Sequence, residues 1–155
     1  MTTDSIRAED ERAAILFVRS LSPNGARAQQ DAVIERLEEL ADRGRLDSYT
    51  VRVWGRAVGT LSAGGRTEQG RRILDRVDDF EEWAAANGKS VGSFFETREQ
   101  AVEFTDETRS ALVLPTMALA EYAGGEIRFV TPCTDGQQVY TVPDRVDELD
   151  AGMVA

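Results

Sequence analysis

The first half of the chain alternates between short apolar runs and helically spaced apolar residues. Ala14–Arg19 is a run of apolar, β-forming residues, and the turn-forming residues after it predict a buried strand that ends there. Between residues 26 and 43 apolar side chains recur at helical spacing, and Gly44 follows as a left-handed stop. Tyr49–Trp54 alternates in polarity and ends at Gly55, which predicts a second strand. The helix is predicted to pack on a sheet through Val33, Ile34, Leu37, Leu40 and Ala41.

A second helix and three β-rich runs follow. Thr67 can cap a helix that extends to Asn87, and the apolar stripe of this helix consists of Ile73, Val77, Phe80 and Ala84. Residues 89–110 leave two alternatives open, because a capping-box pair and an alternating strand pattern occur in the same stretch. Three runs with glycine turns between them predict an antiparallel meander: Leu112–Tyr122, Glu126–Thr131 and Val139–Val142. A closing helix over Asp144–Asp150 is predicted to bury Val146 and Leu149.

The order of these elements sets the expected fold class. A β-α-β-α-β-β-β-α order predicts an α+β fold with a single mixed or antiparallel sheet and helices on one face. A ferredoxin-like arrangement is one candidate. We expect residues 13–151 to form one domain, because 155 residues are too few for two comfortable ones. Residues 1–12 are polar and lack apolar periodicity, so we expect a flexible N-terminal tail.

The charge balance changes this picture. Aspartate and glutamate number 28 against 18 cations, only one of the cations is a lysine, Lys89, and the chain has no histidine. Such a balance suits a cytoplasm at very high salt, although an arginine-rich, GC-rich genome would give the same lysine deficit. No apolar run approaches the length of a membrane span and no signal peptide is visible, so we expect a cytoplasmic protein without a membrane partner.

Residues 43–76 reverse the charge of the chain. This segment holds eight arginines against three acidic residues, a net charge of +5, whereas the remainder sums to −15. Such a segment is a candidate surface for an anionic partner, which could be nucleic acid, a phosphorylated ligand or an acidic protein. Trp54, Trp83, Phe94 and Phe95 could stack on bases, although Trp83 lies near the apolar stripe of its helix.

The candidate anion- or nucleic-acid-binding residues gather at the start of the second predicted helix. They are Arg66, Thr67, Arg71, Arg72 and Arg76. The unpaired amides of the first helical turn add positive potential at this point. The alternative is that these arginines form solvated pairs with Asp75 and Asp79. The preceding loop lies where a phosphate-binding loop would, but it does not complete that motif.

Other potentially reactive residues have simpler interpretations. The acidic groups Glu35, Glu38, Glu39 and Asp42, like Asp78, Asp79, Glu81 and Glu82, occur at the spacing of a solvated helix face and not of a metal site. Cys133 has no histidine to activate it and no second cysteine to pair with, so we expect a buried structural thiol. The sequence therefore predicts neither an enzyme nor a bound metal or cofactor.

Several stretches resemble a known family. They are Phe17-Val-Arg-Ser-Leu-Ser-Pro23, Tyr49–Gly55, the helix from Arg66 to Gly88 with Phe80-Glu-Glu-Trp83, and Thr131-Pro-Cys-Thr-Asp-Gly136. They are similar to small acidic haloarchaeal proteins often labelled helix-turn-helix, over residues 14–149. The resemblance implies a halophilic archaeal source and a DNA-binding regulator, but it assigns no site residues.

These observations together favour a non-enzymatic, intracellular regulatory protein associated with DNA through residues 43–76. The alternative is a protein-interaction module or a module that binds a small anionic ligand, and a third alternative is an enzyme of unrecognised type. The predicted partners are accordingly DNA or an acidic protein, and the sequence leaves the oligomeric state open.

Overall fold

A four-stranded mixed sheet forms the centre of the structure, a computed structural model that describes residues 11–21, 28–59, 68–101 and 108–151. Its strands are β1 (Arg12–Val18), β2 (Ser48–Val53), β6 (Met117–Ala123) and β7 (Glu126–Thr131). They lie in the order β2-β1-β6-β7, with β1 and β2 parallel and the other two pairs antiparallel. Because parallel strands need a crossover connection, α2 (Ala28–Asp42) joins β1 to β2.

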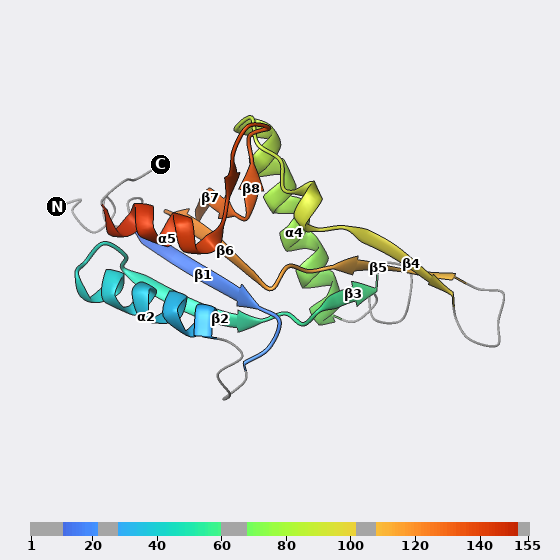
Figure 1. Ribbon diagram of the computed structural model, residues 1–155, viewed down its shortest axis with the longest axis horizontal. Coiled ribbons are helices and arrows are strands. Elements are labelled where there is room, and N and C mark those ends of the chain that lie inside the picture. Colours follow the sequence, from blue (N-terminus) through green and yellow to red (C-terminus); the bar gives the residue numbers. More distant parts are fainter. Residues whose placement is uncertain (1–10, 22–27, 60–67, 102–107, 152–155) are drawn as a thin grey trace.

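One face of this sheet is covered by two helices. Figure 1 shows α2 lying beside α5 (Val142–Asp150) on this face. Their buried residues pack on the side chains that β1 and β6 direct to this face. These residues are Val33, Leu37, Leu40, Val142, Val146 and Leu149 on the helices, and Ala14, Leu16, Val18, Met117 and Leu119 on the strands. Ion pairs of Arg36 with Asp147 (2.8 Å) and of Arg43 with Asp150 (2.6 Å) also join α2 to α5.

The opposite face is covered by α4 (Glu68–Ala86). Val77, Phe80, Trp83 and Ala84 of this helix pack against Phe17, Ala118, Ala120 and Val130 of the sheet. The prediction of helices on one face is therefore wrong. Its physical reason lies in β1, where Leu16 faces α2 and α5 while Phe17 faces α4, so the strand is buried on both sides.

Two smaller sheets complete the architecture. β3 (Ala57–Gly59), β5 (Thr108–Val113) and β4 (Thr97–Ala101) form an antiparallel sheet in that order, and β8 (Cys133–Thr134) pairs with β9 (Val139–Tyr140). A short 3-10 helix, η2 (Gly92–Phe94), precedes β4. The chain turns from β2 toward β3 at Gly55, whose φ of +87° is a conformation that favours glycine.

The structure confirms the α+β class and the mixed sheet. The prediction of a single sheet is wrong, because β3, β5 and β4 pair with one another and β8 pairs with β9, apart from the central sheet. The open stretch 89–110 contains η2, β4 and the start of β5, and β4 begins at Thr97, so the helix alternative that a capping box at Thr97 indicated is wrong. Val102 and Phe104, whose alternation indicated a strand, lie outside the described residues. The predicted run Leu112–Tyr122 divides into β5 and β6, and the last strand of the predicted meander pairs with β8 instead of β7. The closing helix begins at Val142, with Thr141 as its cap.

The ferredoxin-like candidate is wrong. That arrangement is a split β-α-β unit, in which another strand lies between the two strands of the unit. Here β1 and β2 pair directly with each other. The predicted tail falls on residues outside the described ranges up to residue 10 and stays a prediction. Within the described ranges, no helix has the length and apolar character needed to cross a membrane.

Candidate functional site

The predicted arginines lie on the first half of α4. Arg71 and Arg72 are exposed, and Arg72 forms an ion pair with Glu68 at 2.5 Å, one helical turn away. Arg76 is half-buried, donates a hydrogen bond to the hydroxyl of Tyr122 (3.0 Å) and lies 5.1 Å from the ring centre of Phe17. Arg66 and Thr67 lie outside the described residues.

Two of these arginines face the end of β2 across a hollow of about 370 Å³, here called the arginine groove. Its lining residues are Phe17, Arg52, Val53, Trp54, Gln69, Arg72, Ile73 and Arg76. β2 is the edge strand of the central sheet, while α4 packs on β7 and β3, so the groove opens between the helix and the sheet edge. The fold therefore brings Arg52 together with Arg72 and Arg76, although they belong to different elements.

The floor of the arginine groove is part of the apolar core. The rings of Phe17 and Trp54 stack with their centres 4.8 Å apart, and the edge of Trp54 meets Phe95 at 5.8 Å. Trp54 is only 4% exposed, and its indole N–H is buried without a hydrogen-bond partner among the described residues. Trp83 is also buried and donates to the carbonyl of Arg128 at 3.2 Å. Neither tryptophan offers its face to a base, and Phe95 is buried as well, so the stacking hypothesis is wrong for these three residues. Phe94 is half-buried, and for it the hypothesis stays a prediction.

The charges along α4 are unevenly distributed. Its first half carries Arg71, Arg72 and Arg76 with Glu68 and Asp75, and its second half carries Asp78, Asp79, Glu81 and Glu82. The positive potential of the helix N-terminus is confined to the first turn, where Glu68 pairs with Arg72. The positive charge beside the arginine groove therefore comes from the arginine side chains.

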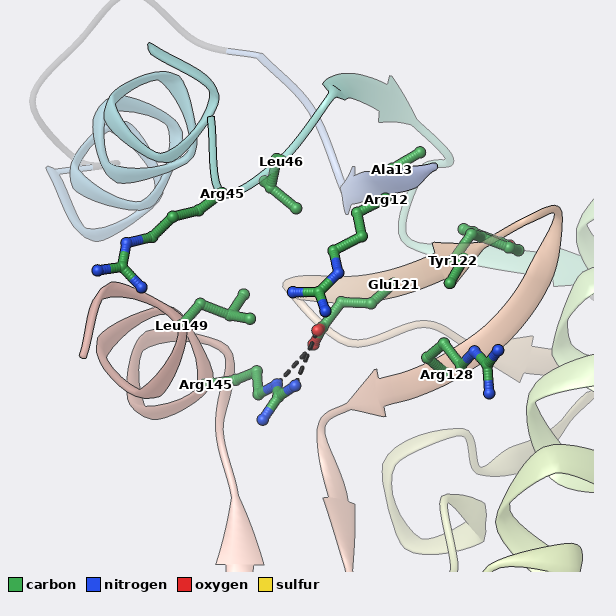
Figure 2. A pocket seen from close by; sticks show the side chains of 10 residues that line it. Arg12, Ala13, Arg45, Leu46, Glu121, Tyr122, Arg128, Arg145 and Leu149 are labelled. Carbon is green, nitrogen blue, oxygen red and sulfur yellow. Dashed lines mark hydrogen bonds and ion pairs between the residues drawn. The ribbon is translucent and has the colours of Figure 1, made fainter. Parts of the chain in front are cut away.

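A second hollow lies at the other end of β1 and has a volume of about 550 Å³. We call it the β1–α5 pocket. It is lined by Arg12, Ala13, Arg45, Leu46, Glu121, Tyr122, Ala123, Arg128, Arg145 and Leu149. Figure 2 shows the guanidinium of Arg12 pointing toward the Glu121 carboxylate, with Leu46 and Leu149 on its other side.

A buried ion pair forms the floor of the β1–α5 pocket. Arg145 donates to both carboxylate oxygens of Glu121, at 2.6 and 2.9 Å, as the dashed lines in Figure 2 show. Their side chains are only 3% and 10% exposed. Arg145 also contacts Glu148 at 3.3 Å and lies 4.2 Å from the ring centre of Phe129. Burial raises the pKa of Glu121 above its ordinary value, against the opposing effect of the Arg145 hydrogen bonds and charge.

The remaining candidates have the environments expected of structural residues. Cys133 is fully buried, and burial raises the pKa of its thiol to about 11, so the reactive thiolate is scarce at neutral pH. The two sets of helical carboxylates are exposed, as predicted. In the part of the chain that the structure describes, no group of three or more His, Cys, Asp or Glu side chains could hold a metal ion.

The family comparison covers almost the whole chain. A family model described as a helix-turn-helix domain matches residues 7–153. The chain belongs to this helix-turn-helix domain family. No curated protein and no solved structure gives a significant match to the chain. Among the described residues of this family member, no two helices follow one another through a short turn, because strands separate α2 from α4 and α4 from α5.

The sequence did not indicate the β1–α5 pocket. Its arginines come from β1, the turn after α2, β7 and α5, so no local cluster marks them. One signal was available, because Val142, Arg145, Val146 and Leu149 follow the i, i+3, i+4, i+7 spacing of a buried helical stripe. A charge at such a position predicts a buried partner, and Glu121 is a charged residue within an apolar run.

Proposed function

We propose that this protein is a regulatory DNA-associated protein that contacts the phosphate backbone through the arginine groove and the exposed arginines beside it. The contact residues are Arg52, Arg71, Arg72 and Arg76. The observation that carries the proposal is the convergence of Arg52 from β2 with Arg72 and Arg76 from the N-terminal half of α4 on one hollow. Membership of a helix-turn-helix domain family supports DNA as the anionic partner.

The geometry favours phosphate contacts over base contacts. A helix-turn-helix reads bases by placing its second helix in the major groove, and the described residues contain no such helical pair. Phosphate contacts need only exposed cations and carry little sequence information. We therefore expect binding with weak sequence preference and strong salt dependence.

The acidic composition opposes this mode of binding less in concentrated salt than in dilute salt, while the phosphate contacts themselves weaken as the salt concentration rises. A net charge of −10 repels DNA at low ionic strength, whereas at about 1 M salt the Debye length falls to about 3 Å and the repulsion acts only at contact. We propose that the protein is cytoplasmic in a halophilic archaeon and has no catalytic activity.

Fluorescence anisotropy with a random-sequence duplex at several KCl concentrations tests the proposal. Each lost phosphate contact lowers the slope of log affinity against log salt by about 0.9. Arg71→Ala/Arg72→Ala should therefore bind more weakly and with a slope shallower by about 1 to 2 units.

The matched control is Arg98→Ala/Arg128→Ala, which removes the same charge from exposed positions outside the arginine groove. This variant should keep the wild-type slope. Equal slopes for all three proteins, or no binding by the wild type at any salt concentration, would refute the DNA proposal. Binding of an acidic protein in place of DNA is then the alternative.

A further inference from the structure

We propose that the β1–α5 pocket binds a small organic anion, a molecule with one carboxylate, sulfonate or phosphate group attached to an apolar body. This site is separate from the arginine groove and does not depend on DNA binding. Its volume of about 550 Å³ lies within the range of pockets that hold small ligands. A neighbouring hollow of about 380 Å³ shares Arg12, Arg45, Leu46 and Leu149 with it and extends the space toward the turn after α2.

The charge of the pocket is opposite to that of the molecule. Four arginines and one glutamate line it, a net charge of +3 in a chain of net charge −10. Arg145 is neutralised by Glu121 and Glu148. The other three, Arg12, Arg45 and Arg128, are exposed, and none of them forms an ion pair with a described carboxylate.

Several other arginines, such as Arg36, Arg43 and Arg72, are paired with carboxylates, whereas Arg52, Arg71 and Arg76 are not paired with any described carboxylate. The three exposed arginines of the pocket belong to the second group. Three cations without such partners at the rim of one hollow create a local positive potential that can concentrate an anion. Arginine is suited to this role because its planar fork matches carboxylate, sulfonate and phosphate oxygens.

The walls and the floor give the ligand an orientation. Leu46 and Leu149, both nearly buried in the protein, offer apolar surface to the pocket, as do Ala13 and Ala123. The Glu121 carboxylate at the floor repels an anionic group. The anionic group therefore lies at the rim beside the three exposed arginines, and the apolar body lies inward on the leucines.

Two fluorescent probes that differ only in charge test the proposal. Anilinonaphthalene sulfonate carries the predicted combination of anion and aromatic body, and N-phenylnaphthylamine is the same ring system without the sulfonate. We expect one molecule of the sulfonate probe to bind per chain. The neutral probe lacks the charge contact and should bind at least about 10-fold more weakly, a difference of about 1.4 kcal/mol. Equal affinity for the two probes, or no binding of the sulfonate, would overturn the proposal.

Variants locate the bound probe. Arg12→Ala/Arg45→Ala changes exposed side chains, leaves the Glu121–Arg145 pair in place, and should weaken sulfonate binding by about 10-fold or more. The control Arg56→Ala/Arg98→Ala removes the same charge elsewhere and should bind as the wild type does. Equal weakening in both variants would contradict the location. Circular dichroism verifies that each variant is folded, because this probe also binds exposed apolar surface in partly unfolded chains.

Competition experiments at constant ionic strength identify which type of anionic group the pocket prefers. Benzoate, phenyl phosphate and inorganic phosphate are added to the protein with the sulfonate probe bound. Displacement by benzoate or phenyl phosphate, and by inorganic phosphate only at much higher concentration, supports a ligand with an apolar body. Displacement by inorganic phosphate alone would overturn that part of the proposal and reduce the pocket to a simple anion site.

Discussion

The arginine groove and the β1–α5 pocket use the same ionic chemistry in opposite environments. Arg72 and Glu68 beside the groove are 74% and 77% exposed, whereas Arg145 and Glu121 in the pocket are 3% and 10% exposed. An exposed pair contributes at most about 1 kcal/mol, because water and salt screen it. A buried pair has lost its hydration, so each charge depends on the other. Arg72 can therefore exchange its partner for a phosphate at little cost, but Arg145 cannot.

The floors of the two hollows also differ, because one is apolar and the other is charged. Beneath the arginine groove lie the stacked rings of Phe17 and Trp54, which belong to the apolar core. Beneath the pocket lies the Glu121–Arg145 pair, with Arg145 placed over the ring of Phe129. The groove has an apolar floor and exposed arginines, whereas the pocket has a buried ion pair at its floor and apolar walls. This difference suits the groove to an extended polyanion and the pocket to a small molecule.

The largest expected effect concerns the buried pair. Glu121→Ala leaves the Arg145 charge buried beside Glu148 alone, and we expect a loss of about 3–5 kcal/mol in the free energy of unfolding. Glu68→Ala, which breaks the exposed pair, should cost less than about 1 kcal/mol. Urea unfolding followed by circular dichroism measures both.

A double variant distinguishes the loss of a pair from the loss of packing. Glu121→Leu/Arg145→Met replaces the buried pair by apolar groups, and such a replacement is often close to neutral. We expect it to be more stable than Glu121→Ala. If the double variant were the less stable of the two, the pair would contribute net stability, and the loss in Glu121→Ala could not be assigned to an uncompensated charge on Arg145.

The sequence predicted the central elements because their apolar patterns are local. β1, α2, β2, α4, β7 and α5 each carry a run or a stripe that indicates one type of element. β4, with the sequence Thr-Arg-Glu-Gln-Ala, carries no such pattern and forms through its pairing with β5. The placement of α4 opposite α2 and α5 also lies outside local patterns, although the continuous apolar run of β1 indicated a strand buried on both faces.

The two hollows differ in how far the sequence revealed them. Two arginines of the groove, Arg72 and Arg76, were candidates from the sequence because they are clustered with Arg71 along one helix, and only the approach of Arg52 needed the fold. The pocket could not be assembled from the sequence, since its residues extend from Arg12 to Leu149. Local charge clusters indicate surfaces, whereas enclosed sites depend on tertiary contacts.

Cys133 lies in the core beneath α4, and its thiol can report on changes around Arg145 and Glu148, whose charges act on it. Its pKa of about 11, against an ordinary value of 9.0, lowers the thiolate fraction at pH 8 by about 100-fold, and its burial slows access further. We expect the wild-type thiol to react with Ellman's reagent only on unfolding. Glu121→Ala should accelerate the reaction, because it loosens the floor near Arg145 and Glu148, whose charges act on this thiol. Arg71→Ala/Arg72→Ala should not change it, and acceleration in both variants would show that the two regions are not independent.

Salt should act on the fold and on the arginine groove in opposite directions. Raising KCl from 0.1 to 2 M screens repulsion among the acidic residues, and we expect the melting temperature to rise by roughly 3–6 °C, which corresponds to about 1–2 kcal/mol for a chain of this size. The same change should weaken DNA binding through the groove. Differential scanning calorimetry measures the first effect, and a flat or falling melting temperature would remove the argument for a protein adapted to high salt.

The smallest expected effect concerns a hydrogen bond that connects the two regions. Tyr122 lines the pocket, and its hydroxyl accepts a hydrogen bond from Arg76 of the arginine groove at 3.0 Å. Tyr122→Phe removes this bond but keeps the ring, so we expect a loss of about 1 kcal/mol in stability.

Arg76 keeps its position over Phe17, so DNA affinity should change by less than about 3-fold. The hydroxyl is directed to α4, away from the pocket floor, so the affinity for the sulfonate probe should stay within about 2-fold of the wild type. A 10-fold change in probe affinity would mean that Arg76 and the pocket are coupled through Tyr122, and the two hollows would then have to be treated as one linked site.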